Sequence, residues 1–173
     1  MKKFVLVMAA AVATLSVSEN LDAMEQVCFK TFTTEQQVVL QDAYDYGKPR
    51  GYGWSMAAMA WKETSAGTHR INWNDPSFGI IQINMNTAIK RYKLTTWKKQ
   101  LEFANKLATN NKFAINVASD ELDFWKGVHK GDMRKMWASY NGGYNYKSKA
   151  PQSYSNDVAK KIAFLKSNRC LFF

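Results

Sequence analysis

The 173-residue sequence is poor in residues that bind metals or interrupt a fold: two cysteines, two histidines and three prolines. Cys28, Cys170, His69 and His129 are too widely spaced to match a metal-ligand pattern, so we expect no metal and no cofactor. We expect both histidines at the surface. The prolines fall between segments of helical periodicity, and no repeat, low-complexity tract or linker divides the chain. The sequence therefore predicts one domain over residues 28–173.

Acidic residues are also scarce, with 14 against 24 lysines and arginines, which gives a formal net charge of +10. A charge of this size favours a polyanionic partner, although solubility alone is an alternative explanation. The basic residues are scattered, and the pairs Lys98-Lys99 and Lys160-Lys161 are too short for a nucleic-acid signature. No strongly basic amphipathic helix predicts membrane disruption. We therefore expect no nucleic-acid or membrane partner, and we attribute the charge to attraction by an anionic cell wall.

The longest uncharged run lies at the N-terminus. Met1-Lys2-Lys3 is positively charged, residues 4–17 carry no charge, and small residues near Ser18 suit a signal peptidase. We interpret residues 1–18 as a secretory signal peptide with cleavage between residues 18 and 23. A retained or later released anchor is the alternative, although the run is short for a bilayer span. The expected location is the periplasm or cell envelope, with release outside the cell as a variant.

Cys28 and Cys170 lie at opposite ends of the predicted mature chain. An even cysteine count in an exported protein suggests a disulfide. A bridge across so long a loop would stabilise the fold by up to about 4–5 kcal/mol in the chain-entropy model. Two free buried thiols are the alternative.

Apolar residues recur at helical spacing along most of the chain, which predicts an all-α fold. The last expected helix begins at Ser153 or Ser155. Residues 68–83 leave room for a small β-hairpin. The expected helices span about 34–46, 54–64, 84–92, 96–107, 112–130, 132–140 and 153–165.

Glu63 lies near the end of an almost uncharged stretch that begins at Trp54. Apolar residues occupy nearly every face of this expected helix, so it should be buried in the centre of the domain. Burial and the negative end of the helix dipole both disfavour a carboxylate and raise its pKa. We therefore interpret Glu63 as a candidate catalytic acid. The alternative is a helix-terminal glutamate in water.

Gln82 interrupts the apolar run Phe78–Asn84. A polar side chain there must be hydrogen-bonded in the core or must line a cleft. Gly79 in the same run allows a close approach of the backbone to a ligand.

Tyr140 and Asn141 lie at an expected helix end, immediately before Gly142 and Gly143. A hydroxyl and an amide at this place suit a cleft wall that offers donors and acceptors to a sugar. A plain helix C-cap is the alternative, since asparagine and glycine favour that position.

These three segments together resemble the soluble-type lytic transglycosylases, which are related to the goose-type lysozymes. In that family a Glu-Ser pair ends an apolar helix, a Gly-Leu-Met-Gln-Ile run follows, and an Ala-Tyr-Asn-Ala-Gly motif closes the site. The counterparts here are Glu63-Thr64, Gly79–Ile83 and Ser139–Gly143, in the same order and at similar spacing. The resemblance covers about residues 53–146 and implies a lysozyme-like helical domain with the small hairpin near the active-site cleft. The departures are small: Thr64 replaces serine, Ile81 replaces methionine, and Ser139 and Gly142 replace alanines. Asn84 stands where many members of the family have another apolar residue.

The resemblance implies a peptidoglycan lytic transglycosylase, a lyase that forms 1,6-anhydromuramyl ends. Most glycosidases need two carboxylates, whereas this sequence offers one well-placed candidate, and the family uses one glutamate as acid and then as base. By resemblance, the Tyr140 hydroxyl would orient or hydrogen-bond Glu63. Gln82, Asn84 and Asn141 would bind the sugar.

Two other functions compete with this one. In a hydrolytic muramidase, Asp75 would activate water, although a turn residue before Pro76 is its simpler interpretation. A wall-binding assembly protein would keep the fold without turnover. The expected partner is a peptidoglycan glycan strand, with secretion, pilus or phage machinery as possible settings and a monomer as the expected state. Candidate sugar-stacking residues, each with a place in the core or rim as its alternative, are Trp54, Trp61, Trp73, Tyr144 and Tyr146.

Overall fold

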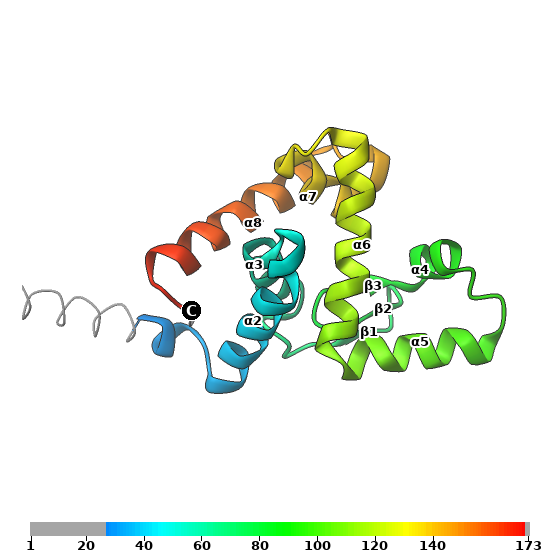
Figure 1. The fold of residues 1–173 in the computed structure, drawn as a ribbon, viewed down its shortest axis with the longest axis horizontal. Helices are drawn as coiled ribbons and strands as arrows, with labels where there is room; N and C mark the ends of the chain where they lie inside the picture. The colour runs from blue at the N-terminus through cyan, green and yellow to red at the C-terminus, as the bar shows by residue number, and fades with distance from the viewer. Residues whose placement is uncertain (1–26, 172–173) are drawn as a thin grey trace, which may run out of the picture.

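The computed structural model describes residues 27–171, which form a predominantly helical domain with one small sheet (Figure 1). This architecture confirms the predicted fold class. The α-helices are α2 (Thr34–Gly47), α3 (Gly53–Thr64), α4 (Met85–Tyr92), α5 (Trp97–Thr109), α6 (Asn111–His129), α7 (Met133–Gly142) and α8 (Lys149–Ser167). Two 3-10 turns are η1 (Lys48–Arg50) and η2 (Gly143–Asn145), and the strands are β1 (Ile71–Asn72), β2 (Ser77–Phe78) and β3 (Ile83–Asn84).

Helix α3 occupies the centre of the domain and packs against α2 and α8. Met56, Met59 and the alanines between and after them are fully buried, as the apolar run predicts. Burial of each methionine side chain stabilises the fold by about 1.5–3 kcal/mol. Helix α7 is joined to the same centre because the Trp137 indole N–H donates to the Ser55 hydroxyl at 3.1 Å. The predicted central helix is confirmed.

Most helix starts follow capping residues of the sequence, but α3 and α8 begin without a side-chain cap. Asn84, Thr96 and Asp132 each accept backbone N–H groups at the starts of α4, α5 and α7. The prediction that the last helix begins at Ser153 or Ser155 is wrong, because α8 begins at Lys149. Pro151 lies in its first turn, where backbone N–H groups have no partner within the helix, so the proline does not interrupt it.

The three strands form one antiparallel sheet in the order β1-β2-β3, in place of a single hairpin. Phe78 pairs with Ile71 on one side and with Ile83 on the other. Gly79 has a φ of +84°, and a Cβ there would lie 2.5 Å from the Leu107 carbonyl oxygen. Gly79 therefore allows the backbone to approach the end of α5 closely.

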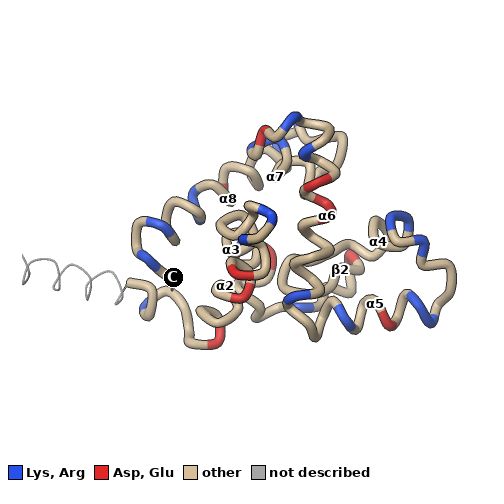
Figure 2. Tube along the Cα trace, viewed as in Figure 1, with Lys and Arg blue, Asp and Glu red and all other residues tan. Residues whose placement is uncertain are grey.

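Cys28 and Cys170 form a disulfide, which joins the segment before α2 to the residues after α8. The even cysteine count suggested this pairing. The predicted signal peptide lies outside the described residues. Within residues 27–171, no helix is long and apolar enough to cross a membrane. Basic residues are spread over α4, α5 and α8 and do not gather in one tract (Figure 2).

Candidate active site

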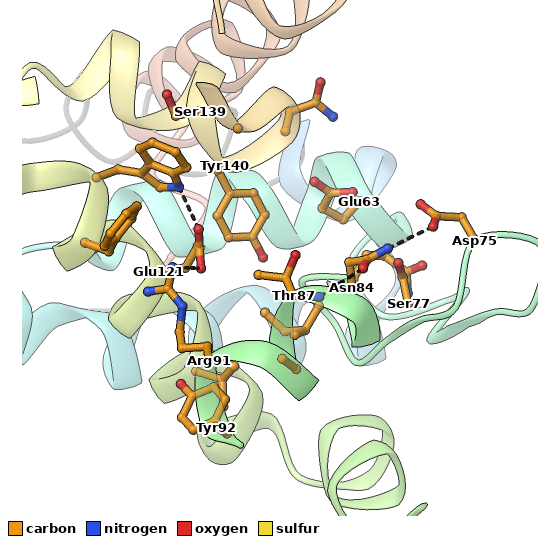
Figure 3. Close-up of a pocket in the computed structure, with 18 of the residues that line it drawn as sticks. Glu63, Asp75, Ser77, Asn84, Thr87, Arg91, Tyr92, Glu121, Ser139 and Tyr140 are labelled. Carbon is orange, nitrogen blue, oxygen red and sulfur yellow. Dashed lines mark hydrogen bonds and ion pairs between the residues drawn. The ribbon is translucent and has the colours of Figure 1, made fainter. Parts of the chain in front are cut away.

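A cleft of about 580 Å³ opens between the end of α3, the sheet and α4 on one side and α6, α7 and η2 on the other. Its lining is rich in hydroxyl, amide and carboxyl groups (Figure 3). The predicted site residues that line this cleft are Glu63, Gln82, Asn84, Tyr140 and Asn141. The structure thus brings together the three segments that the sequence separates.

The Glu63 carboxyl reaches the cleft because α3 ends one residue later. Ser65 takes a left-handed backbone conformation with a φ of +51°, which stops the helix. The Thr64 hydroxyl lies 3.0 Å from the carbonyl oxygens of both Ala60 and Ile80, and it accepts the Gly67 N–H at 2.8 Å. This buried hydroxyl ties the end of α3 to the segment that contains Gln82. Thr64 therefore supplies the hydroxyl that a serine would supply at this position.

The Glu63 carboxyl is a strongly perturbed acid. Burial raises its pKa to about 7, and the Tyr154 hydroxyl and the Lys62 charge oppose that rise. Near neutral pH the carboxyl is therefore present in both protonation states. A group poised in this way can donate a proton and then accept one.

Tyr154, on α8, was not predicted as a site residue. Its hydroxyl is buried, and among the described residues it has no hydrogen-bond partner within ordinary distance. It nevertheless lies close enough to Glu63 for each group to affect the pKa of the other. Burial and the nearby Glu63 charge raise the pKa of the Tyr154 hydroxyl well above its usual range. Its spacing four residues before Val158 is the only sequence signal that could have found it, since that spacing places both on the inner face of α8.

Tyr140 lies between Glu63 and Glu121 in the cleft (Figure 3). The Tyr140 hydroxyl donates to the Ile81 carbonyl at 2.9 Å and so does not donate to Glu63, although it lies close enough for the Glu63 charge to affect its pKa. This bond joins α7 to the same backbone segment that Thr64 contacts. Burial, followed by the charges of Glu63 and Glu121, raises the pKa of the Tyr140 hydroxyl well above its usual range.

Gln82 is held in a fixed orientation by its own loop. Its side-chain amide donates to the carbonyl oxygens of Gly79 at 3.1 Å and His69 at 3.3 Å. The amide oxygen is then the side-chain atom left to meet a ligand. The backbone φ of Gln82 is +50°, in the left-handed region that costs a non-glycine residue about 1–2 kcal/mol. Ser65, Lys93 and Lys130 take this conformation as helix C-caps, whereas Gln82 does not end a helix.

Asn84 uses its side chain to organise the cleft wall. Its Oδ1 accepts the backbone N–H groups of Asn86 and Thr87, and its Nδ2 donates to Asp75 at 2.8 Å. The structure therefore assigns these atoms to capping α4 and holding Asp75. Asn141, in contrast, lies exposed at the cleft edge.

A second buried carboxyl, Glu121, lines the same cleft and was missed in the sequence. Glu121 accepts the Trp125 indole N–H at 2.6 Å and pairs with the Arg91 guanidinium at 2.8 Å. Burial raises its pKa, while Arg91 and Trp125 act in the opposite direction. No local sequence pattern marks the Arg91–Glu121 ion pair, because Arg91 lies on α4 and Glu121 on α6.

The aromatic candidates divide into two groups. Tyr144 lines the cleft and is 76% exposed, and Trp73 is 75% exposed on the loop beside cleft residues Asn72 and Asp75. Trp61 packs edge-on against Phe32, with ring centroids 4.8 Å apart. Two further aromatics, Trp54 and Tyr146, pack against Tyr44 and His129. Only the first group is placed to stack on a sugar.

His69 is exposed, as predicted, whereas His129 is only partly exposed. The His129 ring is partly buried against Trp125, and its Nε2 lies 2.7 Å from the Ser139 Oγ. Among residues 27–171, no group of three or more His, Cys, Asp or Glu side chains is placed to hold a metal ion.

No protein-family model matches the chain, and no solved structure matches it. The chain is 31% identical over 122 residues to an uncharacterised 20.7 kDa protein of Enterobacteria phage T4, from the vs-regB intergenic region. The matched region covers 70% of this chain and 66% of the length of the phage protein.

Proposed function

We propose that the protein is a peptidoglycan lytic transglycosylase that cleaves the β-1,4 bond between N-acetylmuramic acid and N-acetylglucosamine. The observation that carries this proposal is Glu63, a carboxyl whose pKa burial raises to about 7 beside a polar cleft. The cleft volume of about 580 Å³ falls in the range of small-ligand sites. Two exposed aromatic rings, Tyr144 in the cleft lining and Trp73 on the loop beside it, suit the apolar faces of sugars.

The proposed reaction uses Glu63 twice. Protonated Glu63 donates its proton to the bridging oxygen as the bond from the muramyl C1 to that oxygen breaks. The Glu63 carboxylate then takes the proton of the muramyl C6 hydroxyl, whose oxygen forms a bond to C1. No water is consumed, and Glu63 returns to its starting state. A pKa near 7 suits both steps, since neither protonation state is strongly disfavoured at neutral pH.

A hydrolytic muramidase is the second candidate, because Asp75 lines the same cleft as Glu63. Asn84 holds Asp75 in place, so Asp75 could position a water molecule. Glu121 is not a comparable base, since Trp125 and Arg91 each engage one of its two oxygens.

The mass of the product separates the two candidates. Purified protein is incubated with peptidoglycan, and the released fragments are analysed by mass spectrometry. We expect muramyl ends one water molecule lighter than hydrolysed reducing ends, and we expect Asp75→Asn to retain that product. Hydrolysed ends that disappear in Asp75→Asn would establish the muramidase instead.

We further propose that the protein acts on glycan strands in the cell envelope. Among the phage, secretion and pilus settings, the similarity to a phage T4 protein favours a phage setting. Export depends on residues 1–18. Fusion of residues 1–26 to an export-dependent reporter enzyme tests it: reporter activity is expected, and its absence would contradict export.

A further inference from the structure

Arg91 stands apart from the other residues of the cleft because of its charge. Among the described residues that line the cleft, it is the only basic one. The acidic residues there are Glu63, Asp75 and Glu121. A ligand with a negative group therefore has one place in the cleft where its charge meets a fixed cation.

The Arg91 guanidinium is held from three directions. Its Nη2 pairs with Glu121 at 2.8 Å, its Nη1 donates to the Asp120 carbonyl at 3.3 Å, and its plane lies over the Phe124 ring at 4.7 Å. Such support orients a binding group before the ligand arrives, which lowers the entropy lost on binding. These contacts use one donor on each terminal nitrogen, so the five-donor guanidinium keeps others for a ligand.

The charged pair also differs from an ordinary surface ion pair. The Arg91 and Glu121 side chains are 27% and 15% exposed, so both are largely removed from water. A pair with this burial contributes little net stability, since desolvation offsets much of the attraction. Its placement in the wall of a ligand cleft therefore points to recognition rather than to holding the fold together.

We propose that Arg91 binds the carboxylate of the substituent on the muramyl residue, and this inference rests on the proposed function. The sugar backbone of a glycan strand is uncharged. Its carboxylates lie on the muramyl side group, either on the stem peptide or on the free lactyl group once the peptide is removed. Arginine suits such a ligand because its planar fork makes two parallel hydrogen bonds to one carboxylate.

Glu121 already pairs with Arg91, so a ligand carboxylate must either displace Glu121 from the guanidinium or bind to Arg91 alongside it. Its buried position favours its neutral form, so it can take up a proton when a ligand carboxylate engages Arg91. Removal of the Glu121 charge should therefore strengthen the binding of a carboxylate ligand. Removal of Arg91 should weaken it.

The test measures binding calorimetrically with the full chain carrying Glu63→Gln, so that ligands are not cleaved. Three probes are compared: muropeptide fragments with the stem peptide, the same fragments after an amidase has exposed the lactyl carboxylate, and neutral chitotetraose. We expect Arg91→Gln to weaken binding of at least one carboxylate-bearing probe about 10–100-fold while chitotetraose changes less than about twofold. The probe that loses affinity identifies the source of the carboxylate.

Matched variants separate recognition from folding. Lys90→Gln removes the neighbouring charge on α4 and should leave the affinity for all three probes unchanged. Arg91→Lys keeps the charge without the fork and should show an intermediate loss, and Glu121→Gln should tighten carboxylate binding. Thermal melting confirms that each variant is folded at the assay temperature.

Equal loss of affinity for charged and neutral probes, no loss for any probe, or no binding of the carboxylate probes before Arg91 is changed would each overturn the inference. Failure of the proposed function is seen separately. In that case the protein with Glu63 intact releases no fragments from peptidoglycan, whatever the binding data show.

Discussion

Glu63 and Glu121 line the same cleft on either side of Tyr140, and burial raises the pKa of both carboxyls (Figure 3). Their surroundings differ in charge. Glu121 pairs directly with the Arg91 cation and accepts the Trp125 N–H, whereas Glu63 has the Tyr154 hydroxyl beside it and senses the charge of Lys62, which pairs with Asp157 instead. Burial raises both pKa values, and the two carboxyls differ in whether a directly paired cation opposes that rise.

The largest expected effect separates the two glutamates by activity. Glu63→Gln should lower the rate of peptidoglycan lysis by about 10²–10⁴-fold, because it removes the proton donor without changing the shape of the site. Glu121→Gln should stay within about tenfold of the parent, since it changes binding and not proton transfer. Clearing of a peptidoglycan suspension measures both rates. A Glu63→Gln variant that clears the suspension at the parent rate would contradict the assignment of Glu63 as the acid.

The two glutamates can also be compared by their effect on the free energy of unfolding. The pKa of Glu63 is about 7 in the folded protein against an ordinary value of 4.5, so the folded state holds its proton more tightly. The free energy of unfolding contributed by this group is therefore highest below pH 4.5, falls as pH rises to about 7, and is constant above. Glu63→Gln removes this penalty and should stabilise the protein at pH 8 by up to about 3 kcal/mol, and by much less at pH 5. Urea unfolding at both pH values measures the difference, and equal effects would show that the carboxyl is not buried as described.

Loss of the Arg91 charge should lower the free energy of unfolding, whereas Glu63→Gln should raise it. Arg91→Gln leaves Glu121 buried without its cation, so the protein should lose about 1–3 kcal/mol at pH 8. The loss should shrink at pH 5, because Glu121, whose pKa burial already raises, then takes up a proton. The same urea measurements apply, with Lys90→Gln as the control. A loss that does not depend on pH would show that Arg91 acts through packing on Phe124.

Part of this site could be predicted from the sequence, because some of its signals are local. Glu63 ends an uncharged run, and Gln82 interrupts an apolar one, so each is marked by its immediate neighbours. Tyr154 and Glu121 are not marked in this way, since their roles depend on which helices face each other. Helix α8 brings Tyr154 to Glu63 across 91 positions of sequence, and α4 brings Arg91 to Glu121.

The fold shows the same limit at single residues. Helix starts at Asn84, Thr96 and Asp132 follow from their caps, whereas the start of α8 depends on tertiary packing. A Cβ at Gly142 would lie 2.1 Å from the Pro151 Cγ, so the glycine at the end of α7 makes room for the first turn of α8. Pro151, which the sequence suggests as a helix breaker, therefore lies in the contact between α7 and α8.

The smallest expected effect tests the neutral partner that distinguishes Glu63 from Glu121. The Tyr154 hydroxyl lowers the pKa of Glu63, against the larger effect of burial. Tyr154→Phe should therefore raise that pKa further. In the proposed reaction protonated Glu63 is the active form, so the fall in kcat/KM on the alkaline side should move to higher pH.

The rate at neutral pH should rise by no more than about twofold, because a pKa above 7 can at most double the share of Glu63 that is protonated at pH 7. Tyr144→Phe is the matched control, because it removes a hydroxyl from the exposed cleft rim and should leave the alkaline limb in place. A limb that stays fixed in Tyr154→Phe, or moves equally in both variants, would show that burial alone sets the pKa of Glu63. The contrast with Glu121 would then rest entirely on Arg91.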